Sequence, residues 1–211
     1  MRGPRSWLCV FGIIAFAADL QSACAADPGV LYFDAWAIAA RQIGDSLEVR
    51  GVLFHGSVPP PLPLDFDAFE HTLVFAAQLV ATRDGVEIYA PSTIAVYSDV
   101  RATGTLADPA QPGTYTDGDC ILLARLQDLV HSNFGSPGYV TGHFELTGGS
   151  RLDEVVFPPS ILGAGWETVD APAGYHEAWL GQMFYDDPNG IEQRTWSAVK
   201  ALYREDVPAR R

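Results

Sequence analysis

The chain has 211 residues, of which 48% are hydrophobic and 18% are charged, and its formal net charge is −13. This length and apolar content are sufficient for one domain with a buried core, and they exclude a wholly disordered chain. The acidic charge repels nucleic-acid phosphates and anionic lipid head groups, so we expect no nucleic acid among the partners.

The first residues have the pattern of an export signal. Arg2 and Arg5 precede an apolar stretch from Trp7 to Ala18, and Ala23-Cys24-Ala25 forms a small-x-small cleavage site. This pattern predicts a signal peptide that is cut after Ala25, because the apolar stretch is too short to span a bilayer. The protein is therefore expected in the periplasm, at the cell surface or outside the cell. The alternative is a lipoprotein signal, in which Cys24 becomes a lipidated N-terminus and tethers the protein to a membrane.

The sequence divides into a signal peptide (residues 1–25), a β domain (26–186) and a helical tail (187–211). Cys9 and Cys24 leave with the signal, so Cys120 is the remaining thiol and no internal disulfide is expected. No apolar run of transmembrane length remains after the signal is removed.

Period-two alternation of apolar and polar residues dominates the domain and predicts half-buried strands. Residues 32–43 fit either a strand or a short helix, and we favour the strand. The other predicted strands are Leu47–Leu53, His71–Thr82, Thr93–Tyr97, Cys120–Val130, Val140–Leu146 and Glu177–Tyr185.

Turn residues such as Asp84-Gly85, Asp117-Gly118 and Gly148-Gly149 separate these strands. Short strands with such breaks are typical of an antiparallel all-β domain. We expect a single antiparallel β-sandwich, and a small closed β-barrel is the alternative.

The tail has a different period. Asn189 resembles a helix N-cap with Glu192 at the third helical position, and apolar residues then recur at helical spacing. A helix is therefore predicted from Gly190 to about Arg204.

Several catalytic motifs begin in this sequence but are incomplete. His176-Glu177 starts a zinc-protease motif, but Leu180 stands where the second histidine is needed. His143-Phe-Glu145 matches part of a deaminase motif, but no P-C-x-x-C follows, so an outward-facing solvated pair is expected. Cys120 is interpreted as a small core residue. The sequence therefore offers no candidate catalytic residue and favours a non-enzyme.

Asp65, Asp67 and Glu70 form a D-x-D-x-x-E motif in a loop. Clustered carboxylates suit calcium, so these three residues are the candidate ligands if a calcium ion binds, and no other cofactor is expected. We favour the alternative interpretation, in which the aspartates are turn and cap residues.

A resemblance covers about residues 46 to 186. Pro60-Pro-Leu-Pro-Leu-Asp-Phe-Asp67 is followed by Phe69-Glu-His-Thr72, and Tyr97-Ser-Asp99, Thr116-Asp-Gly118 and Gly174-Tyr-His176 come later. In this order the motifs resemble those of uncharacterised exported bacterial β-rich proteins, although His71 replaces their usual tyrosine. The resemblance implies an exported β domain and implies no activity.

The segment from Thr195 to Arg204 is similar to a short C-terminal motif of otherwise unrelated exported bacterial proteins. Here Ser197 stands where glycine is common, and the segment contains the only lysine of the chain. The resemblance implies a sorting or docking tag read by an envelope partner, and a helix packed on the β domain is the alternative. The candidate recognition residues are Trp196, Lys200, Tyr203 and Arg204.

These observations lead to three hypotheses for function. The first is an exported non-enzymatic β domain with a binding or display role. The second is a secreted hydrolase that uses carboxylates, with or without calcium. The third is a barrel that carries a ligand in an apolar cavity.

Overall fold

The computed structural model describes residues 30–56, 61–132, 135–156, 158–168 and 171–184. Within these residues the chain forms nine strands and two short 3₁₀ helices. The strands are β1 (Leu31–Ile38), β2 (Ser46–Gly56), β3 (Phe69–Arg83), β4 (Val86–Tyr89), β5 (Ser92–Val100), β6 (Asp119–Ser132), β7 (Gly138–Gly148), β8 (Ile161–Glu167) and β9 (Glu177–Phe184), and the helices are η1 (Pro112–Tyr115) and η2 (Leu152–Glu154).

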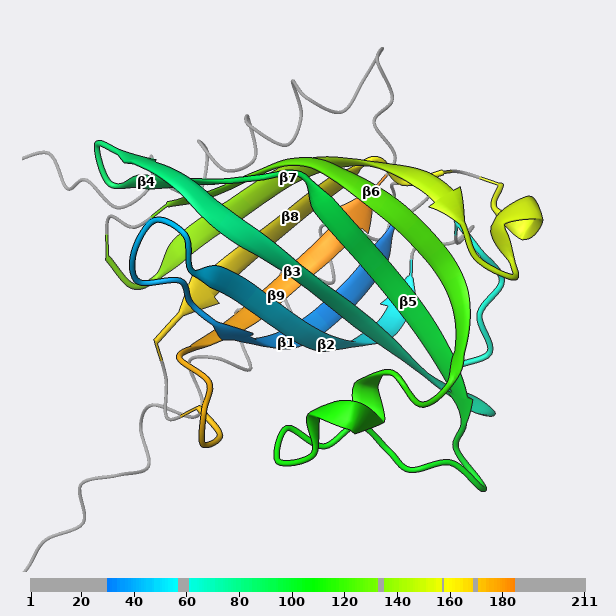
Figure 1. Cartoon of the computed structure of the whole chain (residues 1–211). Coiled ribbons are helices and arrows are strands. Elements are labelled where there is room, and N and C mark those ends of the chain that lie inside the picture. The colour runs from blue at the N-terminus through cyan, green and yellow to red at the C-terminus, as the bar shows by residue number, and fades with distance from the viewer. Residues whose placement is uncertain (1–29, 57–60, 133–134, 157, 169–170, 185–211) are drawn as a thin grey trace, which may run out of the picture.

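The strands close into an eight-stranded antiparallel barrel with one additional strand (Figure 1). Apart from β4 and β5, which do not pair with each other, consecutive strands pair along the chain. β1 pairs with β9 from Leu31↔Met183 to Ala37↔Glu177, which closes the ring. The predicted all-β class is therefore confirmed. The predicted sandwich is wrong and the alternative barrel is confirmed, because the first and last strands pair with each other and leave no sheet edge.

The additional strand β4 continues the line of β5. Both pair with β3 on one side and with β6 on the other. Ala90 and Pro91 separate them, and a proline cannot donate to a strand ladder. β4 and β5 can therefore be regarded as one long strand that is interrupted at Pro91. Both parts lie between β3 and β6 and together count as one of the eight strands of the barrel.

Alternate residues of every strand point into the barrel, as the period-two pattern predicts. The interior side chains are large and almost wholly buried, including Phe33, Leu73, Leu126 and Trp179 at 0–1% exposure. An eight-stranded barrel is just wide enough for its own side chains to fill it.

Small residues make room for the large ones. Gly181 on β9 lies under the Phe33 ring, which a Cβ at this position would overlap. A remaining void beside Leu31, Phe144 and Met183 has a volume of about 10 Å³, which is at the lower limit for one water molecule.

The two ends of the barrel differ, and we name them by their connections (Figure 1). The hairpin end carries the β1–β2, β3–β4, β6–β7 and β8–β9 connections. The loop end carries the longer β2–β3, β5–β6 and β7–β8 connections, the start of β1 and the end of β9. Gly44 and Gly85 at the hairpin end have φ values of +100° and +76°, which glycine adopts without strain.

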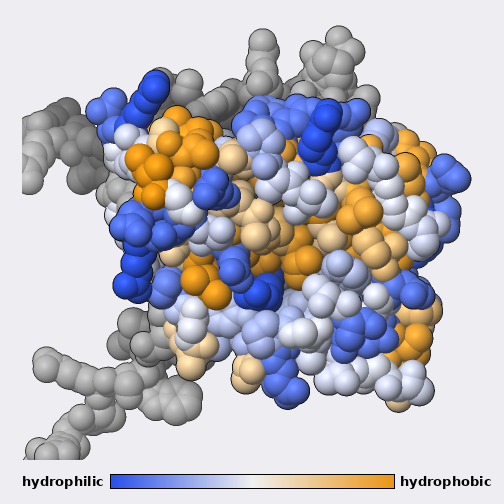
Figure 2. Space-filling model, viewed as in Figure 1, coloured by the Kyte–Doolittle hydropathy of each residue, from blue (hydrophilic) through white to orange (hydrophobic). Residues whose placement is uncertain are grey.

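On the face of the molecule in Figure 2, apolar patches lie among hydrophilic residues. Outward strand positions carry ion pairs such as Arg50–Glu48 and Arg125–Glu145, each at 2.8 Å. In the described part of the chain no helix has the length and apolar character needed to cross a membrane. The predicted helix over residues 190–204 lies outside the described residues and is not among the elements of the structure.

Candidate functional site

Two groups of polar residues lie at opposite ends of the barrel. We call Glu87, Tyr89, His131, Glu177 and Trp179 the hairpin-end cluster, and we call the hollow beside β3, β5 and β6 the loop-end groove.

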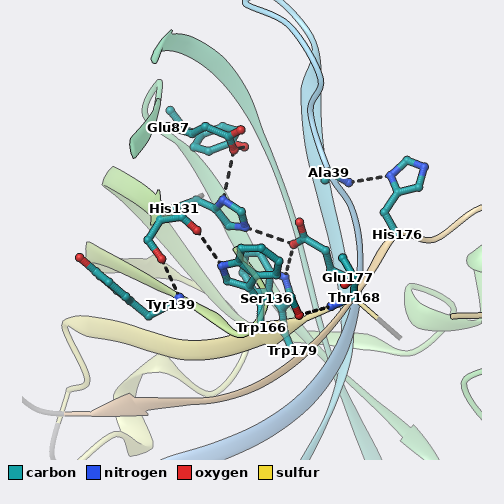
Figure 3. A network of polar contacts seen from close by, with 12 residues as sticks. Ala39, Glu87, His131, Ser136, Tyr139, Trp166, Thr168, His176, Glu177 and Trp179 are labelled. Carbon is teal, nitrogen blue, oxygen red and sulfur yellow. Dashed lines mark hydrogen bonds and ion pairs between the residues drawn. The ribbon is translucent and has the colours of Figure 1, made fainter. Parts of the chain in front are cut away.

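The centre of the hairpin-end cluster is His131, which lies between two carboxylates (Figure 3). Its Nδ1 lies 3.1 Å from Oε2 of Glu87, which is within ion-pair distance, but the angles are not those of a hydrogen bond. Its Nε2 lies 3.2 Å from Oε2 of Glu177 with hydrogen-bond geometry. Because β6 and β9 are three strands apart in the sheet order, His131 connects separate walls of the barrel.

Two further side chains donate hydrogen bonds to the carboxyl groups of this cluster. The Tyr89 hydroxyl donates to Oε2 of Glu87 at 2.8 Å, and Nε1 of Trp179 donates to Oε2 of Glu177 at 2.8 Å. Burial raises the pKa of Tyr89, and its hydrogen bond to Glu87 raises it further, so this phenol stays a donor. A neutral imidazole has one N–H, and Nε2 is the ring nitrogen that has hydrogen-bond geometry, toward Glu177.

Aromatic rings enclose the imidazole. The Trp166 ring stacks on His131 with centroids 4.8 Å apart, and Trp179 lies at 6.0 Å (Figure 3). Nε1 of Trp166 donates to the Ser132 carbonyl at 3.0 Å, which fixes its ring. Glu87, His131 and Glu177 are 7%, 2% and 5% exposed, so a substrate does not reach them in this state. The cluster is therefore a polar plug that closes the hairpin end.

The sequence analysis missed this cluster, although the sequence contained a signal for it. Glu87, His131 and Glu177 each stand two residues from a buried apolar neighbour, on the inward side of a strand. Charged residues at inward positions of three strands indicate that they pair with each other. The neighbouring His176 points away from the plug, and its Nδ1 accepts the Ala39 N–H at 3.1 Å. His176 and Glu177 therefore face different surroundings, which agrees with the dismissal of the zinc-protease motif.

The loop-end groove is an open hollow of about 540 Å³. Apolar side chains of Pro63, Phe69, Val100 and Ile121 line part of it. Four aspartates surround these apolar side chains. Asp65 lies in the β2–β3 connection and Asp99 near the end of β5. Asp117 lies in the turn before β6, and Asp119 is the first residue of β6.

The aspartates of the groove differ in their partners. Oδ1 of Asp65 accepts the N–H groups of Asp67 and Ala68, both at 3.0 Å, and Oδ1 of Asp99 accepts the Val100 N–H at 2.7 Å. The carboxylates of Asp117 and Asp119 have no hydrogen-bond or ion-pair partner among the described residues, and both residues are exposed.

Arg151 is the cation that lines the groove, and another carboxylate already neutralises it. Its guanidinium binds Glu154 in bidentate fashion, with the shortest contact at 2.6 Å, and donates to the Pro63 carbonyl at 3.0 Å. The hydrogen bonds between Arg151 and Glu154 raise the pKa of Arg151 and lower the pKa of Glu154. The aspartates of the groove therefore keep an excess of negative charge.

The three predicted calcium ligands have separate positions. Asp65 closes a turn at the groove, Asp67 is exposed, and Glu70 lies on β3, where its Oε2 accepts the Ala107 N–H at 2.6 Å. Glu70 thereby anchors the β5–β6 connection. In the described part of the chain, no three His, Cys, Asp or Glu residues are arranged to hold a metal ion. Calcium stays a prediction without support from this geometry, and the turn-and-cap interpretation accounts for the contacts of Asp65.

Next to the groove, His71 lies inside the barrel. Its ring contacts Phe66 edge-on at 5.1 Å and stacks on Phe69 at 6.2 Å, and neither ring nitrogen has hydrogen-bond geometry with a described residue. Burial lowers the pKa of His71 to about 4. The backbone of Asp65 opposes this shift, and the charges of Arg151 and Arg101 add to it.

Other residues that the sequence analysis considered have simple structural roles. His143 and Glu145 point outward as predicted, His143 toward Asp128 at 3.0 Å and Glu145 toward Arg125. Cys120 is partly buried, and burial raises the pKa of its thiol. The predicted recognition residues of the tail lie outside the described residues, and they are Trp196, Lys200, Tyr203 and Arg204.

The chain matches no protein-family model, no curated protein and no solved structure.

Proposed function

We propose that this protein is an exported, non-enzymatic β-barrel that binds a cationic partner in the loop-end groove. The observation that carries the proposal is the open hollow of about 540 Å³ with an apolar lining and an excess of carboxylates. Asp117 and Asp119 are exposed without described partners, so a cation that pairs with them displaces no existing contact. Opposite charges across an interface steer association and select partners.

The groove is a better binding site than the barrel interior. Interior side chains such as Phe33 and Trp179 are at 0–1% exposure, and the void beside Met183 has a volume of about 10 Å³. Ligand sites for small molecules are far larger, at roughly 300–1,000 Å³. The filled interior therefore argues against a ligand carried inside the barrel.

The contacts also favour binding over hydrolysis. The hydrolase hypothesis rests on the acidic loop with Asp65 and Asp67, where Asp65 accepts backbone N–H groups and Asp67 is exposed. The neighbouring Glu70 accepts the Ala107 N–H and holds the β5–β6 connection in place. The imidazole and carboxylates that could transfer protons, His131 with Glu87 and Glu177, are buried at the other end of the barrel. Export itself rests on the predicted signal peptide.

Small probes of matched shape test the binding proposal. Phenethylamine and phenylbutylguanidine carry an aromatic ring and a cation, and 2-phenylethanol is a neutral isostere. In titrations followed by NMR, we expect the cations to bind and to shift signals of groove residues. The double variant Asp117→Asn/Asp119→Asn should weaken binding about tenfold, because it removes two charges without changing shape.

A matched control separates local from overall charge. Asp84→Asn/Glu167→Gln removes two carboxylates at the hairpin end and should leave the affinity unchanged. Equal binding of the neutral isostere, or loss of binding in the control variant as well, would refute a cation site in the groove. Robust turnover of any ester, peptide or polysaccharide in a substrate library would refute the non-enzymatic assignment.

A further inference from the structure

The barrel is acidic, whereas one segment of the tail is basic. Residues 30–184 contain 19 of the 26 Asp and Glu residues and six of the 13 Lys and Arg residues. The tail, residues 187–211, contains five Lys and Arg residues and four Asp and Glu residues, and its segment 195–204 contains Lys200 and Arg204 and no Asp or Glu. The segment 195–204 therefore has the charge opposite to that of the barrel.

The last described strand, β9, ends at the loop end. β9 runs from Glu177 at the hairpin end to Phe184, which pairs with Ile161 at the loop end. The groove opens at this same end. The residues between Phe184 and Lys200 reach roughly 50 Å when extended, whereas a rim of eight strands spaced about 4.8 Å apart is only about 15 Å across.

The residue types of the tail match those of the groove. Trp196, Lys200 and Arg204 follow each other at four-residue intervals, so a helix would present them on one face. Tyr203 adds a second aromatic ring beside them. Such a face combines cations for Asp117 and Asp119 with rings for the apolar lining at Phe69 and Ile121.

We propose that the loop-end groove binds the chain's own segment Trp196–Arg204. Lys200 and Arg204 pair with the aspartates of the groove, and the aromatic rings cover its apolar lining. The inference rests on the proposed function, because it names a partner for the same groove. Exposed ion pairs are individually weak, but the covalent tether provides an effective concentration in the millimolar range.

This arrangement makes the tail a competitor for any other cationic partner. An external ligand must displace the segment, and release or cleavage of the tail would open the groove. Because the contacts are exposed ion pairs, added salt should weaken the docking.

The test compares the full chain with its variant Lys200→Gln/Arg204→Gln. The probe is a blocked synthetic peptide with the sequence of residues 195–204, titrated by fluorescence anisotropy at two protein concentrations. We expect the peptide to bind the tail variant about tenfold more tightly than the unaltered chain, because the native tail occupies the groove. Adding Asp117→Asn/Asp119→Asn to the tail variant should abolish this binding, and Asp84→Asn/Glu167→Gln should not.

The outcomes separate this inference from the proposed function. If the peptide binds the unaltered chain and the tail variant equally, the groove accepts cations but the tail is not its occupant, and the inference falls alone. If the peptide binds neither, and phenethylamine also fails, both proposals fall. If the difference disappears on dilution of the protein, the competing tail belongs to a second copy, and the intramolecular contact is refuted.

Discussion

His71 couples the stability of the barrel to pH through a single buried ring. The folded chain keeps this ring neutral down to about pH 4, because burial lowers its pKa, whereas an unfolded chain takes up the proton near pH 6.5. Between about pH 4 and pH 6.5 the unfolded state therefore binds more protons than the folded state. The free energy of unfolding therefore falls as the pH falls from about 6.5 to about 4.

The variant His71→Leu should remove this contribution. Neither ring nitrogen meets hydrogen-bond geometry with a described residue, although the Asp65 backbone favours the charged ring, so an apolar replacement should change the free energy of unfolding little at pH 7. Between pH 7 and pH 4.5 the variant should lose about 2 kcal/mol less stability than the unaltered chain. Urea unfolding at both pH values measures the difference, and parallel pH profiles would contradict this assignment.

Gly181 is a residue whose missing side chain is required by the packing. A Cβ here would overlap the Phe33 ring and lie 2.8 Å from the Cβ of Ala164. Overpacking of this kind costs about 1–3 kcal/mol, so Gly181→Ala should lower the free energy of unfolding by that amount. Gly163→Ala on the adjacent β8 is the matched control, because its Cβ meets only Phe184 at 3.6 Å. Equal stability of the two variants in chemical denaturation would show that Phe33 moves aside without cost.

At the scale of elements, the hairpin-end cluster ties β4, β6 and β9 together through His131. Removing His131 alone leaves the buried carboxyl groups of Glu87 and Glu177 without their imidazole partner. His131→Leu should therefore lower the free energy of unfolding by about 3–5 kcal/mol. His143→Leu, on the neighbouring β7, removes an exposed pair with Asp128 and should change it by less than about 1 kcal/mol.

A second variant separates charge pairing from packing. Replacing Glu87 and Glu177 with leucine together with His131→Leu removes all three charged groups and should recover part of the lost stability, because apolar residues often replace a buried ion pair without cost. If the triple variant is no more stable than His131→Leu alone, the effect of His131 lies in its stacking on Trp166 and Trp179 rather than in its charge.

The strands that the sequence predicted are those with a long alternating pattern. β3 and β6 extend the predicted ranges by a few residues, and β1 ends at Ile38, so residues 39–43 belong to the turn that Asp45 caps. β4 and β8 were missed. β4 has four residues, and β8 contains Gly163 and Gly165, which weaken the alternating pattern of a strand.

At the scale of the whole molecule, the closure of the barrel could not be predicted from local patterns. A sandwich and a barrel bury the same inward residues, and they differ in whether β1 pairs with β9. Residues 31–37 and 177–183 lie far apart in the sequence, so this pairing depends on long-range register. The groove was missed for the same reason, since its aspartates come from separate connections of the chain.

The predicted signal peptide leads to an expected mass for the protein isolated from the cells that produce it. Cleavage after Ala25 leaves β1, which begins at Leu31, and all other described strands intact, so the exported chain keeps the closed barrel. We expect the intact mass of the secreted or periplasmic protein to correspond to a chain that begins at Ala26. A mass that includes residues 1–25, or a lipid on Cys24, would contradict this cleavage site. A mass that ends before Thr195 would mean that the tail is removed after export, and the groove would then be open to other cationic partners.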